Sequence, residues 1–123
     1  MKLPPKKSLA KECEVLWKKC IKARCDGRSE LSGMPTKVIH PHHIMHKPNY
    51  RLRFELDNGI ALTAGEHHFG AHGPNAEEFR DRLIERIGQD KYDWLKSLRH
   101  GAQKTDLYLV KLHLEEKLKE YGG

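Results

Sequence analysis

Long hydrophobic runs are missing from this chain of 123 residues. No stretch approaches the roughly 20 apolar residues of a membrane-spanning helix, and the N-terminal segment MKLPPKKSLAKE lacks the apolar core of a signal peptide. Hydrophobic residues make up 37% of the chain and charged residues 33%, a balance typical of soluble globular proteins. We therefore expect a cytoplasmic protein with no membrane partner, and a single domain over residues 1–123.

Cysteine is scarce as well. The chain has three cysteines, Cys13, Cys20 and Cys25, and no two of them form a CxxC pair. An odd number without such pairs argues against a disulfide framework and against an all-cysteine zinc site. Their helical spacing predicts small buried side chains.

Acidic residues are too few to balance the basic ones. The chain has 23 Lys and Arg residues against 17 Asp and Glu residues, which gives a net charge of +6. A basic chain favours polyanionic partners, and nucleic acid is the first of these.

The apolar residues predict four longer helices. Ser8 is suited to cap a leading helix over residues 8–25, with apolar positions from Leu9 to Ile21 at helical spacing. Three more helices are expected in a helical C-terminal part, residues 75–121, beginning near Asn75, Asp90 and Thr105. Their apolar stripes would either form a small bundle against the rest of the domain or a dimer surface.

The middle of the chain predicts short strands. Val38 and Ile39 mark a β-like segment over residues 37–40, and residues 51–56 alternate between apolar and charged side chains. The turn signal Asp57-Asn58-Gly59 separates residues 51–56 from the apolar residues 60–62, which suggests a hairpin or a bulged reversal. A short helix is expected over residues 64–72. The predicted class is therefore α+β.

Seven of the nine histidines lie between His40 and His72, in the strings VIHPHHIMH and GEHHFGAH. Imidazole is the commonest metal ligand and the usual general base near neutral pH. In the second string, His68 and His72 are four residues apart. On an α-helix they share one face and can bind one ion, whereas His67 points about 100° away.

The first string separates two roles. Neighbouring side chains of a strand point to opposite faces, so His42 and His43 are not expected to bind the same ion. One can hold a metal while the other takes a proton from water, which is the division of labour that metal-assisted hydrolysis needs. His40 and His46 are interpreted as loop residues or as supports of the ligands.

The residues H42-H43-I44, then D57-N58-G59-I60-A61-L62-T63-A64-G65-E66-H67-H68, resemble the HNH (ββα-metal, or His-Me finger) endonucleases. They are similar to that family's [D/H]HI opening, central Asn and LCxxCH closing. The resemblance covers residues 24–72 and is nearest to small phage- and prophage-type members. It implies a ββα-metal core over residues 37–73, a DNA substrate, duplex or branched, and a bacterial or phage-infected cell.

The resemblance also implies roles. His42 would bind the metal ion and His43 would be the general base, while Asn58 would orient His43 or, as in some members, ligate directly. The helix histidines would complete the shell. A histidine-rich shell suits Mn²⁺, Ni²⁺, Co²⁺ or Zn²⁺ better than Mg²⁺, although Mg²⁺ stays among the usable ions. Arg51 and Arg53, on the polar face of their segment, are predicted to contact phosphates.

The chain departs from the family pattern in two places. The zinc-knuckle positions carry Ser29, Ser32, Thr63 and Glu66 in place of cysteine, so no structural zinc is expected. Counting from Leu62 places the closing histidine at His67, whereas α-helical geometry favours His68 with His72, and both remain open. The expected function is a divalent-metal-dependent endonuclease that nicks or cuts DNA. The alternative is a non-catalytic, metal-stabilised module that binds DNA or protein.

Overall fold

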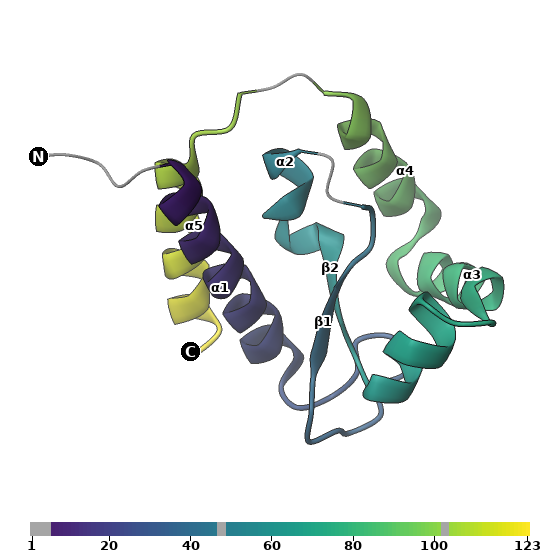
Figure 1. The fold of residues 1–123 in the computed structure, drawn as a ribbon. Coiled ribbons are helices and arrows are strands. Elements are labelled where there is room, and N and C mark those ends of the chain that lie inside the picture. The colour runs from purple at the N-terminus through teal and green to yellow at the C-terminus, as the bar shows by residue number, and fades with distance from the viewer. Residues whose placement is uncertain (1–5, 47–48, 102–103) are drawn as a thin grey trace, which may run out of the picture.

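The structure is a computed structural model that describes residues 6–46, 49–101 and 104–123. A two-stranded antiparallel sheet lies between two helical groups, with α1 and α5 on one side and α3 and α4 on the other (Figure 1). The predicted α+β class is confirmed in this form, mostly helical with one small sheet. The elements in order are α1 (Lys6–Cys25), β1 (His40–His43), α2 (Tyr50–Arg53), η1 (Leu56–Asn58), β2 (Gly59–Leu62), η2 (Glu66–Ala71), α3 (Ala76–Ile87), α4 (Gln89–Ser97), η3 (Leu98–His100) and α5 (Leu107–Glu120).

The first and last helices pack side by side. The thiol of Cys13 donates to the carbonyl of Leu107, at 3.4 Å, and that of Cys20 to the carbonyl of Leu114, at 3.3 Å. All three cysteines are free and buried, as their spacing predicted. Burial raises the pKa values of Cys13 and Cys20, so these thiols belong to the core.

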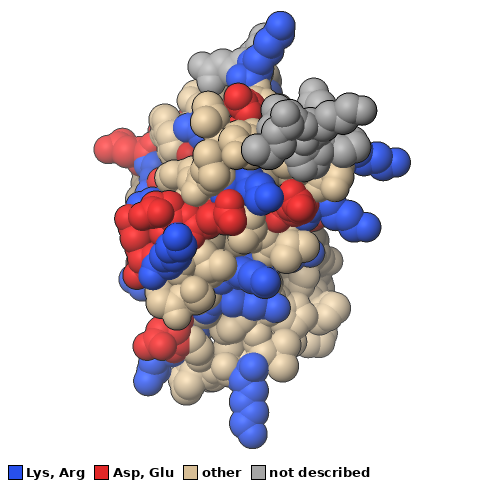
Figure 2. Space-filling view, turned by 90° about the vertical axis from the view of Figure 1, so that its left-hand side faces the viewer, with Lys and Arg blue, Asp and Glu red and all other residues tan. Residues whose placement is uncertain are grey.

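The outer face over α1 and α5 carries both signs of charge. Lys and Arg side chains alternate there with Asp and Glu side chains (Figure 2), and ion pairs such as Lys111–Glu12 and Lys117–Glu120 join them. No helix in the described ranges combines the length and the apolar character that crossing a membrane requires.

The sheet differs from the predicted hairpin. β1 lies at His40–His43, later than the predicted residues 37–40, and it pairs with β2. The predicted strand over residues 51–56 is wrong: this segment contains the short helix α2 and leads into η1. Asn49 explains the difference, because its side chain accepts the backbone N–H of Leu52 at 2.9 Å and caps a helical turn.

The observed helix ends agree with the sequence for α3 and differ from it for α1 and α5. Asn75 precedes α3 and Gly88 ends it with a φ of 95°. α1 begins at Lys6, so Ser8 lies inside the helix and the predicted cap is wrong. α5 is capped by Asp106, one residue after the predicted Thr105. Its Oδ1 accepts hydrogen bonds from the backbone N–H groups of Tyr108 and Leu109.

Candidate metal centre

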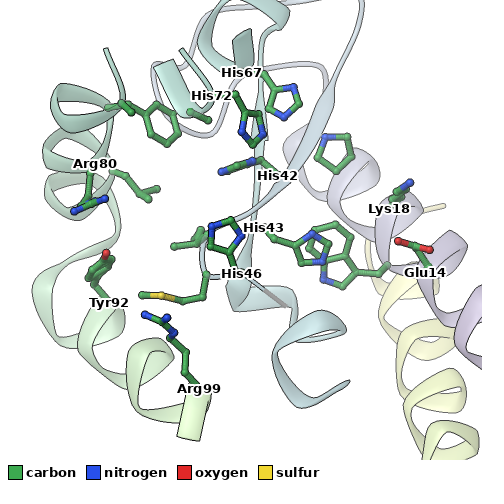
Figure 3. A pocket seen from close by; sticks show the side chains of 18 residues that line it. Glu14, Lys18, His42, His43, His46, His67, His72, Arg80, Tyr92 and Arg99 are labelled. Carbon is green, nitrogen blue, oxygen red and sulfur yellow. The ribbon is translucent and has the colours of Figure 1, made fainter. Parts of the chain in front are cut away.

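A pocket of about 560 Å³ lies beside β1. It is lined by side chains from α1, β1, η2, α3, α4 and η3. Figure 3 shows histidines in the middle of this pocket, two arginines and a tyrosine along one wall, and residues of α1 along the opposite wall. The pocket therefore collects the histidines that the sequence places far apart.

Strand alternation separates the two neighbouring histidines of β1. His43 lies opposite Gly59 in the sheet and stacks on Trp17 of α1, with ring centroids 4.0 Å apart and an interplanar angle of 3°. His42 faces the other way, and its ring meets Phe79 of α3 edge-on at 5.9 Å. The two side chains thus have different neighbours, as the strand pattern predicted.

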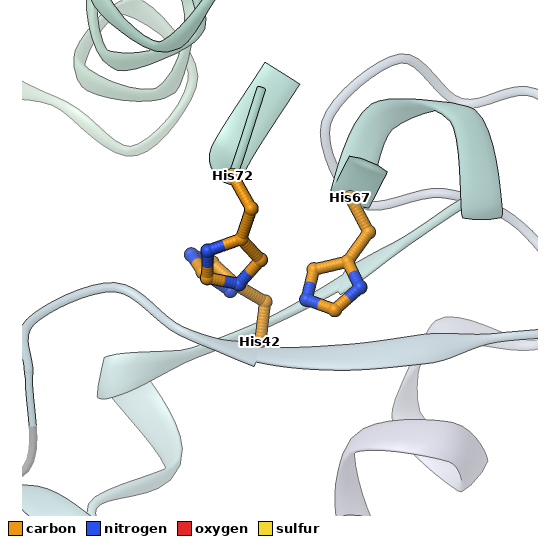
Figure 4. Close-up of side chains that lie close together, drawn as sticks. All are labelled: His42, His67 and His72. Carbon is orange, nitrogen blue, oxygen red and sulfur yellow. The ribbon is translucent and has the colours of Figure 1, made fainter. Parts of the chain in front are cut away.

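Three imidazoles converge on the His42 side of the sheet. Each of His42, His67 and His72 offers one ring nitrogen, and these atoms all lie within 4.8 Å of one another. The ring centroids of His67 and His72 are 4.6 Å apart, and that of His42 is 5.4 and 5.2 Å from them. Figure 4 shows His42 reaching up from the strand toward the other two. Three imidazoles are a suitable donor set for a first-row divalent ion.

The pairing within η2 depends on its π-helical turn. The backbone N–H of His72 bonds the carbonyl of His67 at 3.1 Å, five residues back, as in a π-helix. The wider turn places His67 and His72 together. The exposed His68 stands outside the three-histidine cluster, with its ring centroid 5.9 Å from that of His67. The predicted His68–His72 pair assumed α-helical spacing, and the structure brings His67 to His72 instead.

The surroundings of His42 and His67 favour the neutral form of both rings. Burial, together with the nearby His67 and His72, lowers the pKa of His42 to about 4. Burial and the nearby His72 and His40 also lower the pKa of His67. Both rings are therefore neutral at pH 7, and a neutral imidazole is the form that binds a metal ion.

His40 contacts His67, one of the three clustered histidines. It lies two residues before His42 on β1, hence on the same face, and its Nδ1 is 3.2 Å from Nδ1 of His67. A metal-binding imidazole usually uses its second nitrogen for a hydrogen bond that fixes the ring. This contact leaves Nε2 of His67 for an ion.

His43 is oriented by a backbone carbonyl. Its Nε2 lies 2.9 Å from the carbonyl oxygen of Arg53. A carbonyl only accepts, so Nε2 carries a proton in this contact. Trp17, on which the ring stacks, is itself anchored by a 3.0 Å bond from its Nε1 to the carbonyl of Glu55.

Asn58 is fully buried and ties the surrounding loop together. Its Oδ1 accepts the N–H of Met45 at 2.8 Å, and its Nδ2 donates to the carbonyls of Met45 and Leu52 at 3.2 and 3.0 Å. Leu52 immediately precedes Arg53, whose carbonyl holds His43. The amide is therefore engaged in positioning the loop beside His43, rather than directed at an ion.

Arg51 and Arg53 already have acidic partners. Arg51 pairs with Glu55 of its own segment, and Arg53 pairs with Glu14 of α1 at 3.0 Å. The guanidinium of Arg53 also lies over the ring of Phe54, 5.3 Å from its centroid. The predicted exposed strand face is absent, and both arginines bind protein groups that neutralise their charge.

Glu66 occupies one of the four positions where the resemblance places zinc-binding cysteines, and it hydrogen-bonds to the residues at the other three. Its carboxylate accepts from Ser29 Oγ at 2.7 Å and from the N–H of Thr63 at 2.8 Å, while its own N–H donates to Thr63 Oγ1 at 3.1 Å. Burial acts to raise its pKa, but the bonds from Ser32, Thr63 and Ser29 prevail and lower it. The Thr63-x-x-Glu66 spacing is a capping box, a sequence signal that identifies this residue.

Two cations of the pocket were not identified from the sequence, Arg80 of α3 and Arg99 of η3. They line the pocket together with Lys18 of α1. No motif links residues so far apart, so only the folded chain brings them together.

Comparison of the chain with family models, with curated proteins and with solved structures finds no match in any of the three.

Proposed function

We propose that this protein is a divalent-metal-dependent endonuclease of the HNH type, which hydrolyses phosphodiesters of DNA. One observation carries the proposal: the adjacent residues His42 and His43 of β1 line the same pocket but have different neighbours. His42 lies in a three-imidazole cluster, and His43 is oriented by a backbone carbonyl. Metal binding and proton abstraction are thereby assigned to different side chains.

The roles follow from this geometry. His42, His67 and His72 would hold the ion. Bound there, a divalent ion supplies charge stabilisation to the phosphate and to the leaving oxygen. His43 takes a proton from the attacking water at Nδ1, and its Nε2–H bond to the carbonyl of Arg53 stabilises the imidazolium that forms.

The position of His67 supports the resemblance to the HNH endonucleases. Counting without gaps from Leu62 reaches His67, and His67 is the residue that lies with His42 and His72. The order β1, β2 and η2 is also a strand–strand–helix order. Asn58, between the two histidine groups, holds the loop beside His43. These features favour the endonuclease over other metal-binding proteins.

Supercoiled plasmid DNA tests the proposal. Purified protein is incubated with plasmid and Mn²⁺, Mg²⁺, Ni²⁺, Co²⁺ or Zn²⁺ in turn, and an EDTA sample serves as control. We expect conversion to nicked or linear DNA with at least one ion and none with EDTA. Plasmid that stays supercoiled with every ion would overturn the endonuclease proposal.

A further inference from the structure

Three exposed cations line the rim of the pocket. Lys18, Arg80 and Arg99 are exposed, and within the described ranges none of them takes part in an ion pair. Among the described residues that line the pocket, Glu14 is the one carboxylate, and it pairs with Arg53. The rim is therefore a surface of positive charge.

Each rim cation follows a residue that packs in the interior, and two of these three residues contact a histidine of the pocket. Lys18 follows Trp17, on which His43 stacks. Arg80 follows Phe79, whose ring meets that of His42. Arg99 follows Leu98, which packs near Met45 and whose carbonyl accepts from Asn49 at 3.0 Å. The backbone at each of the three cations is thus anchored by a packed neighbouring residue.

The cations stand on opposite walls. Figure 3 shows Lys18 on the α1 side, Arg80 and Arg99 on the other side, and the histidines between them. A nucleic-acid strand carries one charge about every 3.4 Å along its axis. With one phosphate at the histidines, its neighbours in the strand extend toward both walls. A single small phosphate ester has no such neighbours and would leave the rim unused.

We propose that Lys18, Arg80 and Arg99 bind the phosphates on either side of the one at the histidine site, so that a DNA strand crosses the pocket from α1 to α3 and η3. This inference rests on the proposed function for the centre of the pocket. It assigns strand binding to three separate helices, in place of the ion-paired Arg51 and Arg53. It also identifies the substrate as an internal phosphodiester of a polymer.

The salt dependence of DNA binding tests the rim. Fluorescence anisotropy measures binding to a labelled duplex in EDTA, where no cleavage occurs, over a range of NaCl concentrations. The variants are Lys18→Gln, Arg80→Gln and Arg99→Gln. The controls, Lys19→Gln, Arg82→Gln and Lys96→Gln, each remove an exposed cation that does not line the pocket from a neighbouring position. Circular dichroism verifies that every variant is folded.

Each lost phosphate contact should lower the slope of log K against log[salt] by about one. We expect this loss for each rim variant, a loss of about three for the triple rim variant, and no change for the controls. A triple variant with the wild-type slope, or controls that lose as much as the rim variants, would overturn the proposal. So would wild-type protein that does not bind the duplex at low salt.

The assay also separates this proposal from the endonuclease proposal. Protein that binds DNA through the rim but leaves plasmid intact with every ion refutes only the nuclease. If the protein cleaves plasmid and the rim variants keep the wild-type salt slope, only the proposed role of the rim cations is refuted.

Discussion

The two faces of the β1–β2 sheet differ in how they hold a histidine. On the α1 face, His43 lies flat on Trp17, and Gly59 opposite it lets the strand approach the helix closely. On the η2 face, His42 meets two further imidazoles. The dipeptide His42-His43 thus supplies two rings with different neighbours. The ring of His43 stacks on an aromatic side chain, and the ring of His42 faces two other imidazoles. The alternation of the strand thus gives the proposed base and the proposed ligand different neighbours, α1 for His43 and the η2 histidines for His42.

Loss of the proposed base should have the largest effect. We expect His43→Ala to reduce the rate of plasmid cleavage by about 10²–10⁴-fold, because general-base catalysis contributes about that much. Metal affinity should stay near the wild-type value, since His43 lies on the other face of the sheet. Cleavage rates and calorimetric metal titration measure the two effects.

A second substitution separates catalysis from packing. His43→Gln retains a donor for the Arg53 carbonyl but has no basic nitrogen, so it should be as inactive as the alanine variant. His113→Ala, on the exposed face of α5, should cleave like the wild type. Equal loss of metal binding in the His43 variants would contradict the division between the two faces.

Substitution of His67, His68 and His72, which lie in η2 or directly after it, tests the η2 face. His67→Ala and His72→Ala should each weaken metal binding by at least about 100-fold, because each removes a ligand, and even an outer-shell loss costs 10–100-fold. His68→Ala should bind metal as the wild type does. An α-helical pairing would give the reverse pattern, with His68→Ala weak and His67→Ala unaffected.

His40 should give a smaller effect on the same face. We expect His40→Ala to weaken metal binding by about 10-fold, the lower end for a residue that orients a ligand, because the ring of His67 loses its partner at 3.2 Å. Calorimetry of His40→Ala alongside His46→Ala measures it. An effect as large as that of His67→Ala would make His40 a ligand itself.

The tight packing of the α1 face predicts an effect on stability instead of on metal binding. A Cβ on Gly59 would lie 2.5 Å from Cζ2 of Trp17 and 2.6 Å from Cδ1 of Ile21. Gly59→Ala should therefore lower the free energy of unfolding by about 1–3 kcal/mol, as added methyl groups do in packed cores. Gly65→Ala is the matched control, because the nearest atom to its Cβ is 3.9 Å away and its φ of −63° suits alanine. Urea unfolding measures both, and equal destabilisation would contradict the close approach.

The sequence predicted those features that depend on local signals. Gly88 ends α3, the cysteines of α1 are buried, and His42 and His43 point to opposite faces. Each follows from the period of a helix or strand, or from one backbone angle, so neighbouring residues suffice to establish it.

Features that depend on tertiary contacts were not predictable in this way. The alternation of residues 51–56 suits a strand, but the Asn49 cap and the buried amide of Asn58 hold that segment as α2 and η1. The π-turn of η2 changes which histidine lies beside His72, and no spacing rule for α-helices contains it. The rim cations come from three helices that only the fold brings to one pocket.

The most direct test is a crystal structure of the protein with Mn²⁺, with the ion located by anomalous scattering. We predict one strong peak bonded to His42, His67 and His72, with water completing its shell and His43 nearby but not bonded to it. A peak on His68 with His72, a shell closed by a fourth protein ligand, or a bond to His43 would contradict the proposed separation of ligand and base.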